Sequence, residues 1–278
     1  MSVKQKFPVM SAKNVDINKI TFSSLKKLPN GAKISYVNYG NIEDDGIVSL
    51  QMVTPMVDFP FDAKFFADEN GGKWSCKVAL KGDSDAMNEF IKTMTQFDDK
   101  IKSEAIKNSQ AWFGKKSLTE DVMLEKYTPI VRPYKEPETG EETGKYAPQL
   151  AFKVPFKNDK YECKFYDENK DLINITDKDG DDYKDIENIL KKGISTKMIL
   201  KCNGMWFSAS GFGCTWKAVQ MKVKVPVELD SYAFDDTDDD DDDDDDDAAS
   251  DKYVMDSTEE EESDEEVIVK KSNRKGSK

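Results

Sequence analysis

The segment TKMILKCNGMWFSASGFGCTWKAVQMKVKV, residues 196–225, carries the longest strand signal in the chain. Its two halves are rich in apolar and aromatic residues, and Ser210-Gly211-Phe212-Gly213 stands between them. Two such stretches joined by a short glycine-containing connection are typical of a β-hairpin. We therefore predict that the folded core ends in one long hairpin.

Shorter alternating stretches upstream predict further strands, because apolar residues at every second position line one face of a strand. These stretches are KISYV from residue 33, IVSLQM from residue 47, KWSCKVAL from residue 73, LAFKVPF from residue 150 and YECKFY from residue 161. Gly, Pro, Asn and Asp residues bound them, as turns require.

The apolar spacing changes to three and four residues after Gly82, which predicts a helix capped by Asp83 or Ser84. A second, shorter helix is predicted from Ser117, which forms a capping-box pattern with Glu120, to near Tyr127. A third is predicted around 183–190. Strands, one or two main helices and then strands indicate an α+β, mainly β fold. We expect an enlarged OB-like antiparallel barrel.

Charge divides the chain into unlike parts. The net charge is −14, yet residues 229–278 hold 22 acidic and 6 basic residues, and residues 1–228 hold 33 acidic and 35 basic ones. Ten consecutive aspartates, 238–247, repel one another too strongly to pack. We predict a flexible arm at 1–14, a core at 15–228 and a disordered acidic tail at 229–278.

Several residue types needed for catalysis or metal binding are missing. The chain has no histidine, the commonest general base and metal ligand. Its cysteines, Cys76, Cys163, Cys202 and Cys214, form no CxxC pair. The segment DKDGDD at 177–182 resembles a calcium loop, but Asn188 stands where the bidentate glutamate belongs, which favours an ordinary turn. No phosphate-binding glycine motif is present. We expect no enzyme, no cofactor and no metal.

The N-terminal residues lack the apolar stretch of a signal peptide, and no run of residues is apolar enough to cross a bilayer. We therefore expect an intracellular protein with reduced thiols and no membrane partner. The oligomeric state is left open, with a homo-oligomer as one possibility.

Lysines alternate with aromatic residues along the core, as in proteins that bind single-stranded nucleic acid. Lysines neutralise phosphates there, and aromatic rings stack on bases. Only two of the 41 basic residues are arginines, Arg132 and Arg274, so few bidentate contacts to base edges are available. Burial in the core is an equally physical explanation for each tryptophan. The candidates are Lys33, Tyr36, Tyr39, Lys73, Trp74, Lys77, Trp112, Lys115, Lys116, Lys145, Tyr146, Lys201, Trp206, Phe207, Trp216, Lys217 and Lys222.

The acidic tail suggests three roles: competition with nucleic acid for the core, recruitment of basic or replication and repair proteins, or maintenance of solubility. Ser257, Thr258 and Ser263 each have an acidic residue three positions downstream, the pattern that acidophilic kinases prefer. Phosphorylation at these residues would add negative charge.

Five segments carry a family resemblance: WFGKK (112–116), YTPIVRP (127–133), YAPQLAFKVPF (146–156), KCNGMWF (201–207) and FGCTWKAVQMKV (212–223). Together they resemble the single-stranded DNA-binding proteins of nucleocytoplasmic large DNA viruses. The resemblance implies an OB-type core, sequence-independent coating of single strands in viral DNA replication, recombination or repair, and replication proteins as partners. It also implies the host cytoplasm or nucleus as the location.

Two functions from different classes remain open on the sequence. The first is binding of single-stranded DNA by stacking and lysine contacts. The second is an acidic chaperone that holds basic proteins such as histones through its aspartates.

Overall fold

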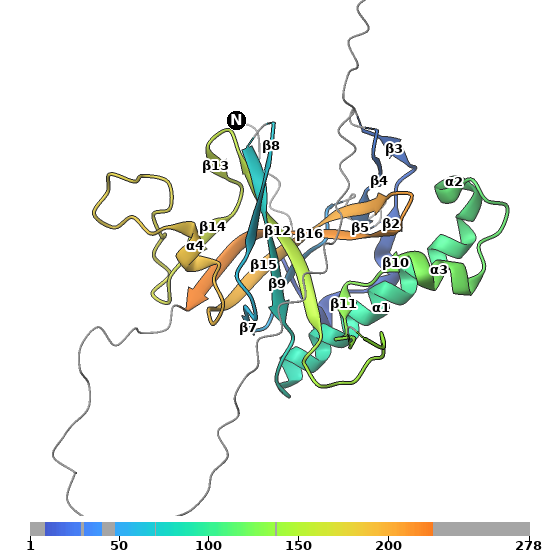
Figure 1. Cartoon of the computed structure of the whole chain (residues 1–278), viewed down its shortest axis with the longest axis horizontal. Helices are drawn as coiled ribbons and strands as arrows, with labels where there is room; N and C mark the ends of the chain where they lie inside the picture. The colour runs from blue at the N-terminus through green and yellow to red at the C-terminus, as the bar shows by residue number, and fades with distance from the viewer. Residues whose placement is uncertain (1–8, 29–30, 41–47, 70, 137, 225–278) are drawn as a thin grey trace, which may run out of the picture. The chain divides into compact units, whose positions relative to one another are not determined.

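The computed structural model describes residues 9–28, 31–40, 48–69, 71–136 and 138–224 (Figure 1). The chain divides into two units, Met1–Val225 and Pro226–Lys278. The predicted tail at 229–278, with Ser257, Thr258 and Ser263, lies outside the described residues. Residues 1–8 of the predicted arm lie outside them too.

Five strand segments close into a barrel. They are β6–β7 (Gln51–Val53 and Val57–Asp58), β9 (Gly71–Ala79), β12 (Gln149–Lys157), β15 (Ser195–Phe207) and β16 (Phe212–Lys224). Each pairs with the next in the order β7-β9-β12-β16-β15. Strand β15 also pairs with β6 and β7, which closes the barrel. Numbered along the chain, the order is 1-2-3-5-4 and back to 1, the arrangement of an OB-fold barrel. The predicted fold class, mainly β and OB-like, is confirmed.

The sheet is mixed, whereas the sequence suggested an antiparallel barrel. Lys153 of β12 pairs in parallel with Lys217 of β16, and β14 (Lys164–Tyr166) pairs in parallel with the end of β16. The parallel step arises because β16 closes the barrel against β12, and the chain between these strands crosses over instead of turning back directly.

Other short strands extend the barrel sheet: β1 (Met10–Ser11), β3 (Lys26–Lys27), β4 (Lys33–Ser35), β8 (Lys64–Asp68), β10 (Tyr127–Thr128), β11 (Val131–Arg132) and β13 (Lys160–Tyr161). Strands β2 (Ile20–Phe22) and β5 (Val37–Tyr39) form a separate two-stranded sheet. Strand β1 pairs with β6, and Ala12 is buried. Ordered packing therefore begins before residue 15, inside the predicted arm.

Four α-helices occur in the described part of the chain: α1 (Asp85–Lys107), α2 (Ser109–Phe113), α3 (Glu120–Lys126) and α4 (Ile186–Ile189). Ser84 caps α1, since its hydroxyl accepts a hydrogen bond from the backbone N–H of Met87 at 3.2 Å. Thr119, not the predicted Ser117, is the N-cap residue of α3. No helix among the described residues has the length and apolar character needed to cross a membrane.

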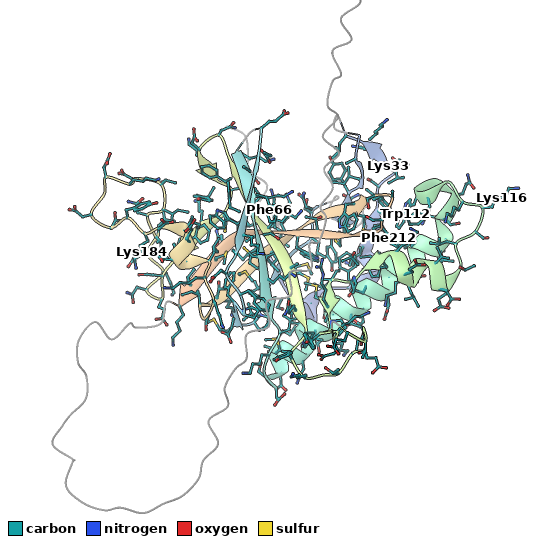
Figure 2. All side chains as sticks on the ribbon, viewed as in Figure 1. Lys33, Phe66, Trp112, Lys116, Lys184 and Phe212 are labelled. Atoms are coloured by element: carbon teal, nitrogen blue, oxygen red, sulfur yellow. The ribbon has the colours of Figure 1, made fainter. Side chains whose placement is uncertain are left out.

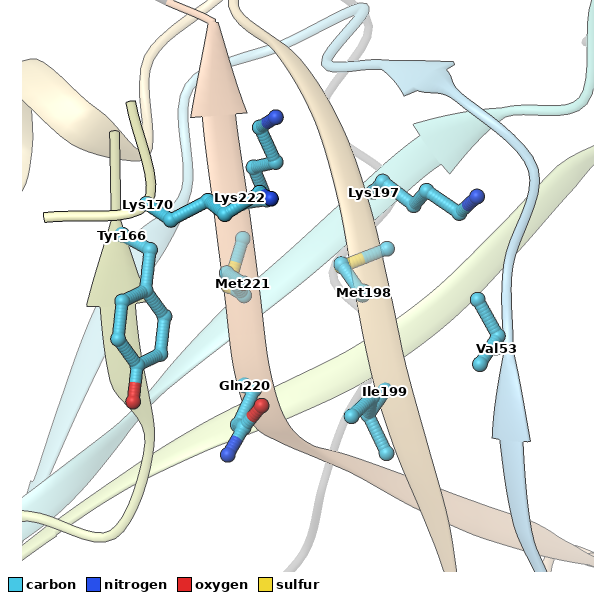
Figure 3. Close-up of a pocket in the computed structure, with 9 residues that line it drawn as sticks. All are labelled: Val53, Tyr166, Lys170, Lys197, Met198, Ile199, Gln220, Met221 and Lys222. Carbon is cyan, nitrogen blue, oxygen red and sulfur yellow. The ribbon is translucent and has the colours of Figure 1, made fainter. Parts of the chain in front are cut away.

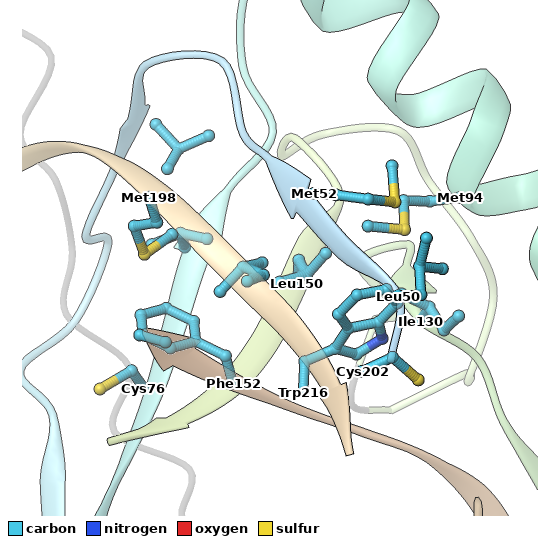
Figure 4. Close-up of a cluster of buried hydrophobic side chains, with 14 of the residues drawn as sticks. Leu50, Met52, Cys76, Met94, Ile130, Leu150, Phe152, Met198, Cys202 and Trp216 are labelled. Atoms are coloured by element: carbon cyan, nitrogen blue, oxygen red, sulfur yellow. The ribbon is translucent and has the colours of Figure 1, made fainter. Parts of the chain in front are cut away.

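Alternating side chains of the strands fill the barrel, and α1 packs beside it (Figure 4). Cys76 and Val78 of β9 lie inside with Phe152 of β12, all 2 % exposed or less. Helix α1 contributes Phe97, whose ring meets Trp216 edge to face with centroids 6.1 Å apart. The helix thus covers apolar surface that the barrel leaves open.

Two glycines allow β9 to lie very close to both neighbouring strands. Gly71 and Gly72 have φ angles of +133° and +147°. A Cβ at Gly71 would stand 2.4 Å from the carbonyl oxygen of Phe156, and one at Gly72 would stand 2.5 Å from that of Phe66. Only glycine fits this junction of β8, β9 and β12.

A buried carboxylate ties α1 to the segment that follows α3. Asp98 accepts hydrogen bonds from the Tyr127 hydroxyl, from the Ile130 N–H at 2.8 Å and from the Val131 N–H at 3.2 Å. Burial raises the pKa of Asp98 above its ordinary value, although these hydrogen bonds act in the opposite direction.

Asp98→Asn should destabilise the fold by about 1–3 kcal/mol, because the new amide N–H₂ cannot accept the hydrogen bond of Val131 and leaves a buried donor unpaired. Urea unfolding measures the free energy. The folded state holds the Asp98 proton to higher pH than the unfolded chain does, so the advantage of wild type over Asp98→Asn should be largest in acid. That advantage should shrink as pH rises above about 4.

Asp99→Asn is the matched control, since Asp99 is an exposed neighbour that pairs with Lys102 at 3.1 Å. It should change the unfolding free energy by less than about 0.5 kcal/mol. Equal unfolding free energies of the two variants would show that the buried hydrogen bonds of Asp98 do not stabilise the fold.

Candidate nucleic-acid interface

Five lysines lie on the outer surface of four adjacent barrel strands, and we call them the lysine face: Lys73, Lys77, Lys153, Lys201 and Lys217. Their outward direction follows from strand alternation, because the residues between them are buried inside the barrel. The lysine face spans β9, β12, β16 and β15.

Strand register places several of these lysines in one row. Lys201 lies opposite Lys217, Lys217 opposite Lys153, and Lys153 opposite Ser75. Ser75 in turn lies opposite Lys64 of β8. At about 4.8 Å between strands, the row from Lys201 to Lys64 is roughly 20 Å long. It runs across the strands, so an extended anionic chain laid on it would meet three lysines in succession, then Ser75, then Lys64.

One carboxylate lies within the lysine face. Lys217 Nζ donates a hydrogen bond to Glu162 Oε2 at 2.6 Å. This hydrogen bond lowers the pKa of Glu162, and the charges of Lys217, Lys157 and Lys201 lower it further. Glu162 therefore remains ionised and occupies a position among the lysines that another anion could take.

Exposed aromatic residues border the face at the β8–β9 hairpin. Phe66 is 48 % exposed and lies opposite Lys73, on the same side of the hairpin. Phe65 is 42 % exposed and packs on Trp74, with ring centroids 5.2 Å apart. Phe61, on the loop before β8, is 57 % exposed. Rings presented to solvent beside lysines suit stacking on bases.

Another aromatic side chain, Trp206, lies at the opposite end of the lysine face, near the turn at 208–211. Trp206 is half-buried, and strand register places it in a row with Ile34 of β4 and Gly213 of β16. Gly213 leaves room for its indole, since a Cβ there would stand 3.1 Å from Trp206 Nε1. The lysine face thus lies between Phe66 and Trp206.

Five of the predicted aromatic residues lie in the core and are not part of this surface. Each is 8 % exposed or less, and they are Tyr39, Trp74, Trp112, Phe207 and Trp216. Their strand or helix positions point inward, where large rings remove the most apolar area from water. As placed, none of them can stack on a base, which is the alternative explanation that the sequence left open.

The remaining predicted residues lie apart from the lysine face. Lys115 and Lys116 follow α2, and Figure 2 shows Lys116 far from Phe66. Lys145 covers the exposed ring of Tyr146 at 5.4 Å in the loop before β12. Lys222 lies further along β16.

Lys33 and Tyr36 lie near Trp206 at the β4 end of the sheet. Lys33 pairs with Phe207 across β15, and Lys26 Nζ is 5.0 Å from the centre of the exposed Tyr36 ring. Tyr36 extends the aromatic surface beside Trp206, because Lys26 lies opposite Ile34 on the Trp206 side of the sheet. Lys33 points to the other side, because it lies opposite the buried Phe207.

Sequence reasoning missed Lys153, Phe66 and Phe61. Strand β8 offers no alternation to read, because all five of its residues are exposed. Adjacent phenylalanines in the polar segment FDAKFFAD were the available signal. Two apolar side chains in a row cannot both face a core from one strand.

The described residues contain no cluster of three potential metal-ligating side chains. All four cysteines are free. Burial raises the pKa of Cys76 and of Cys163 well above the ordinary thiol value. Cys202 and Cys214 lie close, with sulfur atoms 3.2 Å apart. The segment at 177–182 is a turn in which the Asn174 side chain bonds Asp182 at 2.9 Å.

Residues 77–236 match the model of a family of unknown function, DUF5871. The chain belongs to this family. The match covers more than half of the chain and includes β12, β15 and β16 of the lysine face. A search of curated proteins gives no match.

Solved structures of phage proteins resemble the fold at low similarity. The single-stranded DNA-binding protein from bacteriophage Enc34, in complex with single-stranded DNA, is 7% identical with a TM-score of 0.36, covering 75% of this chain and 97% of that one. The gp2.5 single-stranded DNA-binding protein of bacteriophage T7 is 12% identical with a TM-score of 0.37, covering 69% and 98%. Similarity at this level says nothing about what the DUF5871 chain binds.

Trp206→Phe should sharply reduce the quenching of tryptophan fluorescence by acrylamide, because Trp74, Trp112 and Trp216 are 7 % exposed or less. Stern–Volmer titration of the folded chain measures this accessibility. Trp112→Phe is the matched control and should leave quenching nearly unchanged. Equal reductions in both variants would contradict the placement of Trp206 at the surface.

Proposed function

We propose that this protein binds single-stranded DNA without sequence preference. The observation that carries the proposal is the lysine face with aromatic residues at both of its ends. OB-fold proteins bind oligonucleotides on the face of strands 2 and 3 and between the loops that follow strands 1 and 4. In this chain those elements are β9, β12, the β8 hairpin and the turn at 208–211.

The chemistry of the face favours phosphates over base edges. Lysine is a compact point charge, which neutralises phosphates but does not form the bidentate pairs through which arginine reads guanine. Arg132 is the one arginine among the described residues, and its Nε donates to the Pro129 carbonyl at 3.3 Å. The lysine face itself is built without arginine, which supports binding that is independent of sequence.

The aromatic residues favour a single strand over a duplex. A duplex encloses its base faces, whereas a single strand exposes them to rings such as Phe66 and Trp206. Stacking on one aromatic side chain contributes about 1–3 kcal/mol per base. The proposed interface consists of the lysine face, Phe66 and Trp206, with Tyr36 beside Trp206.

The acidic tail supplies a competitor and a docking segment in this proposal. Its aspartates present anionic charge comparable to that of a nucleic acid strand and so can compete for the lysines, or can recruit replication and repair proteins. The role in viral replication, recombination or repair and the location in the host cell come from the family resemblance and stay predictions. So does the expectation that the chain is not an enzyme.

Replacing Lys77 and Lys201 together by alanine should weaken binding of a dT oligonucleotide. It should also reduce the slope of log K against log salt by about 1.4, since each phosphate contact on a single strand contributes about 0.7. Phe66→Ala should weaken binding by about 1–3 kcal/mol and leave the slope unchanged. Fluorescence anisotropy at several salt concentrations separates the two effects.

Lys92→Ala is the matched control, because Lys92 lies on α1 and pairs with Glu89 at 3.8 Å. It should keep both the affinity and the slope of wild type. If the wild-type chain and a chain ending at Glu228 both bind dT no more tightly than duplex DNA, the proposal is wrong.

Ending the chain at Glu228 should strengthen dT binding, because removal of 22 acidic residues leaves a region with 33 acidic and 35 basic ones. Replacing Asp238–Asp247 by serine in the full chain controls for length and should act in the same direction. Unchanged DNA binding together with loss of histone binding in both variants would instead support the acidic chaperone. Anisotropy with labelled dT and with labelled histone measures both outcomes.

A further inference from the structure

A groove of about 360 Å³ lies on the outer surface of the barrel, between β6, β14, β15 and β16 (Figure 3). Nine residues line it, and none of them is acidic. Lys170, Lys197 and Lys222 lie toward one end in Figure 3, and Gln220 and Ile199 lie toward the other. The Tyr166 ring runs along one side, from the lysine end toward Gln220. The groove therefore combines cations with an apolar and aromatic wall.

Strand register fixes this arrangement. Tyr166 of β14 lies opposite Lys222 of β16, and Lys222 lies opposite Lys197 of β15. One step along the strands, Gln220 lies opposite Ile199. A row that contains a ring and two lysines thus lies beside Gln220 and Ile199. This arrangement matches a nucleotide that has a base on one side and a phosphate on the other.

The groove continues the outer surface that carries the lysine face. Lys197, Ile199 and Lys201 alternate outward along β15, so Lys197 is four residues, or about 13 Å, from Lys201. On β16 a register shift beside Ile199 places Val219 out of the pairing, between Lys217 and Gln220. A strand bound along the lysine row can turn at this bulge and follow β15 and β16 into the groove.

Lys170 stands at a position that ordinarily favours glycine. Its φ is +74°, in a turn where its N–H donates to the Asp167 carbonyl at 3.2 Å. The backbone there would accept glycine with less strain, yet the chain places a lysine that lines the groove. Glu168, two residues before Lys170, pairs with Lys224 at 3.8 Å.

We propose that this groove is a second subsite for the same single strand, in which Lys170, Lys197 and Lys222 bind phosphate and Tyr166 stacks on a base. The inference rests on the proposed function and lengthens its footprint beyond the lysine face. Short oligonucleotides occupy the lysine face alone, and longer ones reach both surfaces.

The test uses the full chain with two dT oligonucleotides at the limits of OB-fold site sizes, about 4 and about 16 nucleotides. Lys170→Gly with Lys197→Ala should reduce the salt slope for the longer oligonucleotide by about 1.4 and leave that for the shorter one unchanged. Lys170→Gly lowers the backbone strain at a positive φ, and the Lys197 side chain is exposed. Neither substitution therefore removes a buried side chain.

Tyr166→Leu tests whether the Tyr166 ring stacks on a base. It should weaken binding of the longer dT oligonucleotide severalfold and leave binding of an abasic strand of equal length unchanged. Lys92→Ala is again the control and should alter neither oligonucleotide.

The outcomes separate this inference from the proposed function. If the wild-type chain binds neither oligonucleotide and the chain ending at Glu228 also fails, the proposed function is wrong and the groove has no strand to bind. Suppose instead that wild type binds both oligonucleotides. If the groove variants then show the same increase in affinity from the shorter to the longer oligonucleotide as wild type, or lose equal affinity for both, the second subsite is wrong and only the lysine face is supported.

Discussion

The structure depends on the pairing of β15 with four other strands. Along its length β15 bonds to β16, to β6 and β7, and to β4. Pairing with β7 and β16 closes the barrel, while pairing with β4 extends the sheet past it. Two register shifts and Gly204 make this possible, because a Cβ at Gly204 would stand 2.8 Å from the Ser35 carbonyl oxygen. The bulges bend the hairpin so that one strand pairs both with the barrel strands and with β4.

Closure also decides what the outer surface carries. Once Trp216 and Phe152 point into the barrel, Lys217 and Lys153 must point out, since neighbouring residues of a strand face opposite sides. The parallel step between β12 and β16 then brings those two lysines together from distant parts of the chain. The core and the candidate interface are therefore two sides of the same alternation.

Local signals in the sequence were enough to predict several elements. The hairpin and the helix after Gly82 were predicted because their periodicity lies within one segment, although α1 runs to Lys107 and the turn is at 208–211. The lysine face could not be predicted as a unit, because its members come from four strands whose register only closure fixes. Nor could the sequence distinguish Trp206, which points outward, from Trp216, which points inward. Both lie in predicted strands, and only the bulge at Asn203 sets the side to which Trp206 points. Phe66 was not predicted as a site residue, because every residue of β8 is exposed and the strand shows no apolar alternation.

The row of lysines has a consequence for the free protein. Like charges directly opposite one another across a sheet are destabilising, and Lys201, Lys217 and Lys153 are successive partners. Glu162 offsets part of this through one hydrogen bond at 2.6 Å. Repulsion among these lysines opposes pairing of the strands that carry them, and a polyanion bound there would reduce this repulsion. Under the proposed function, binding and folding are therefore thermodynamically linked, and an anionic strand would stabilise the folded state.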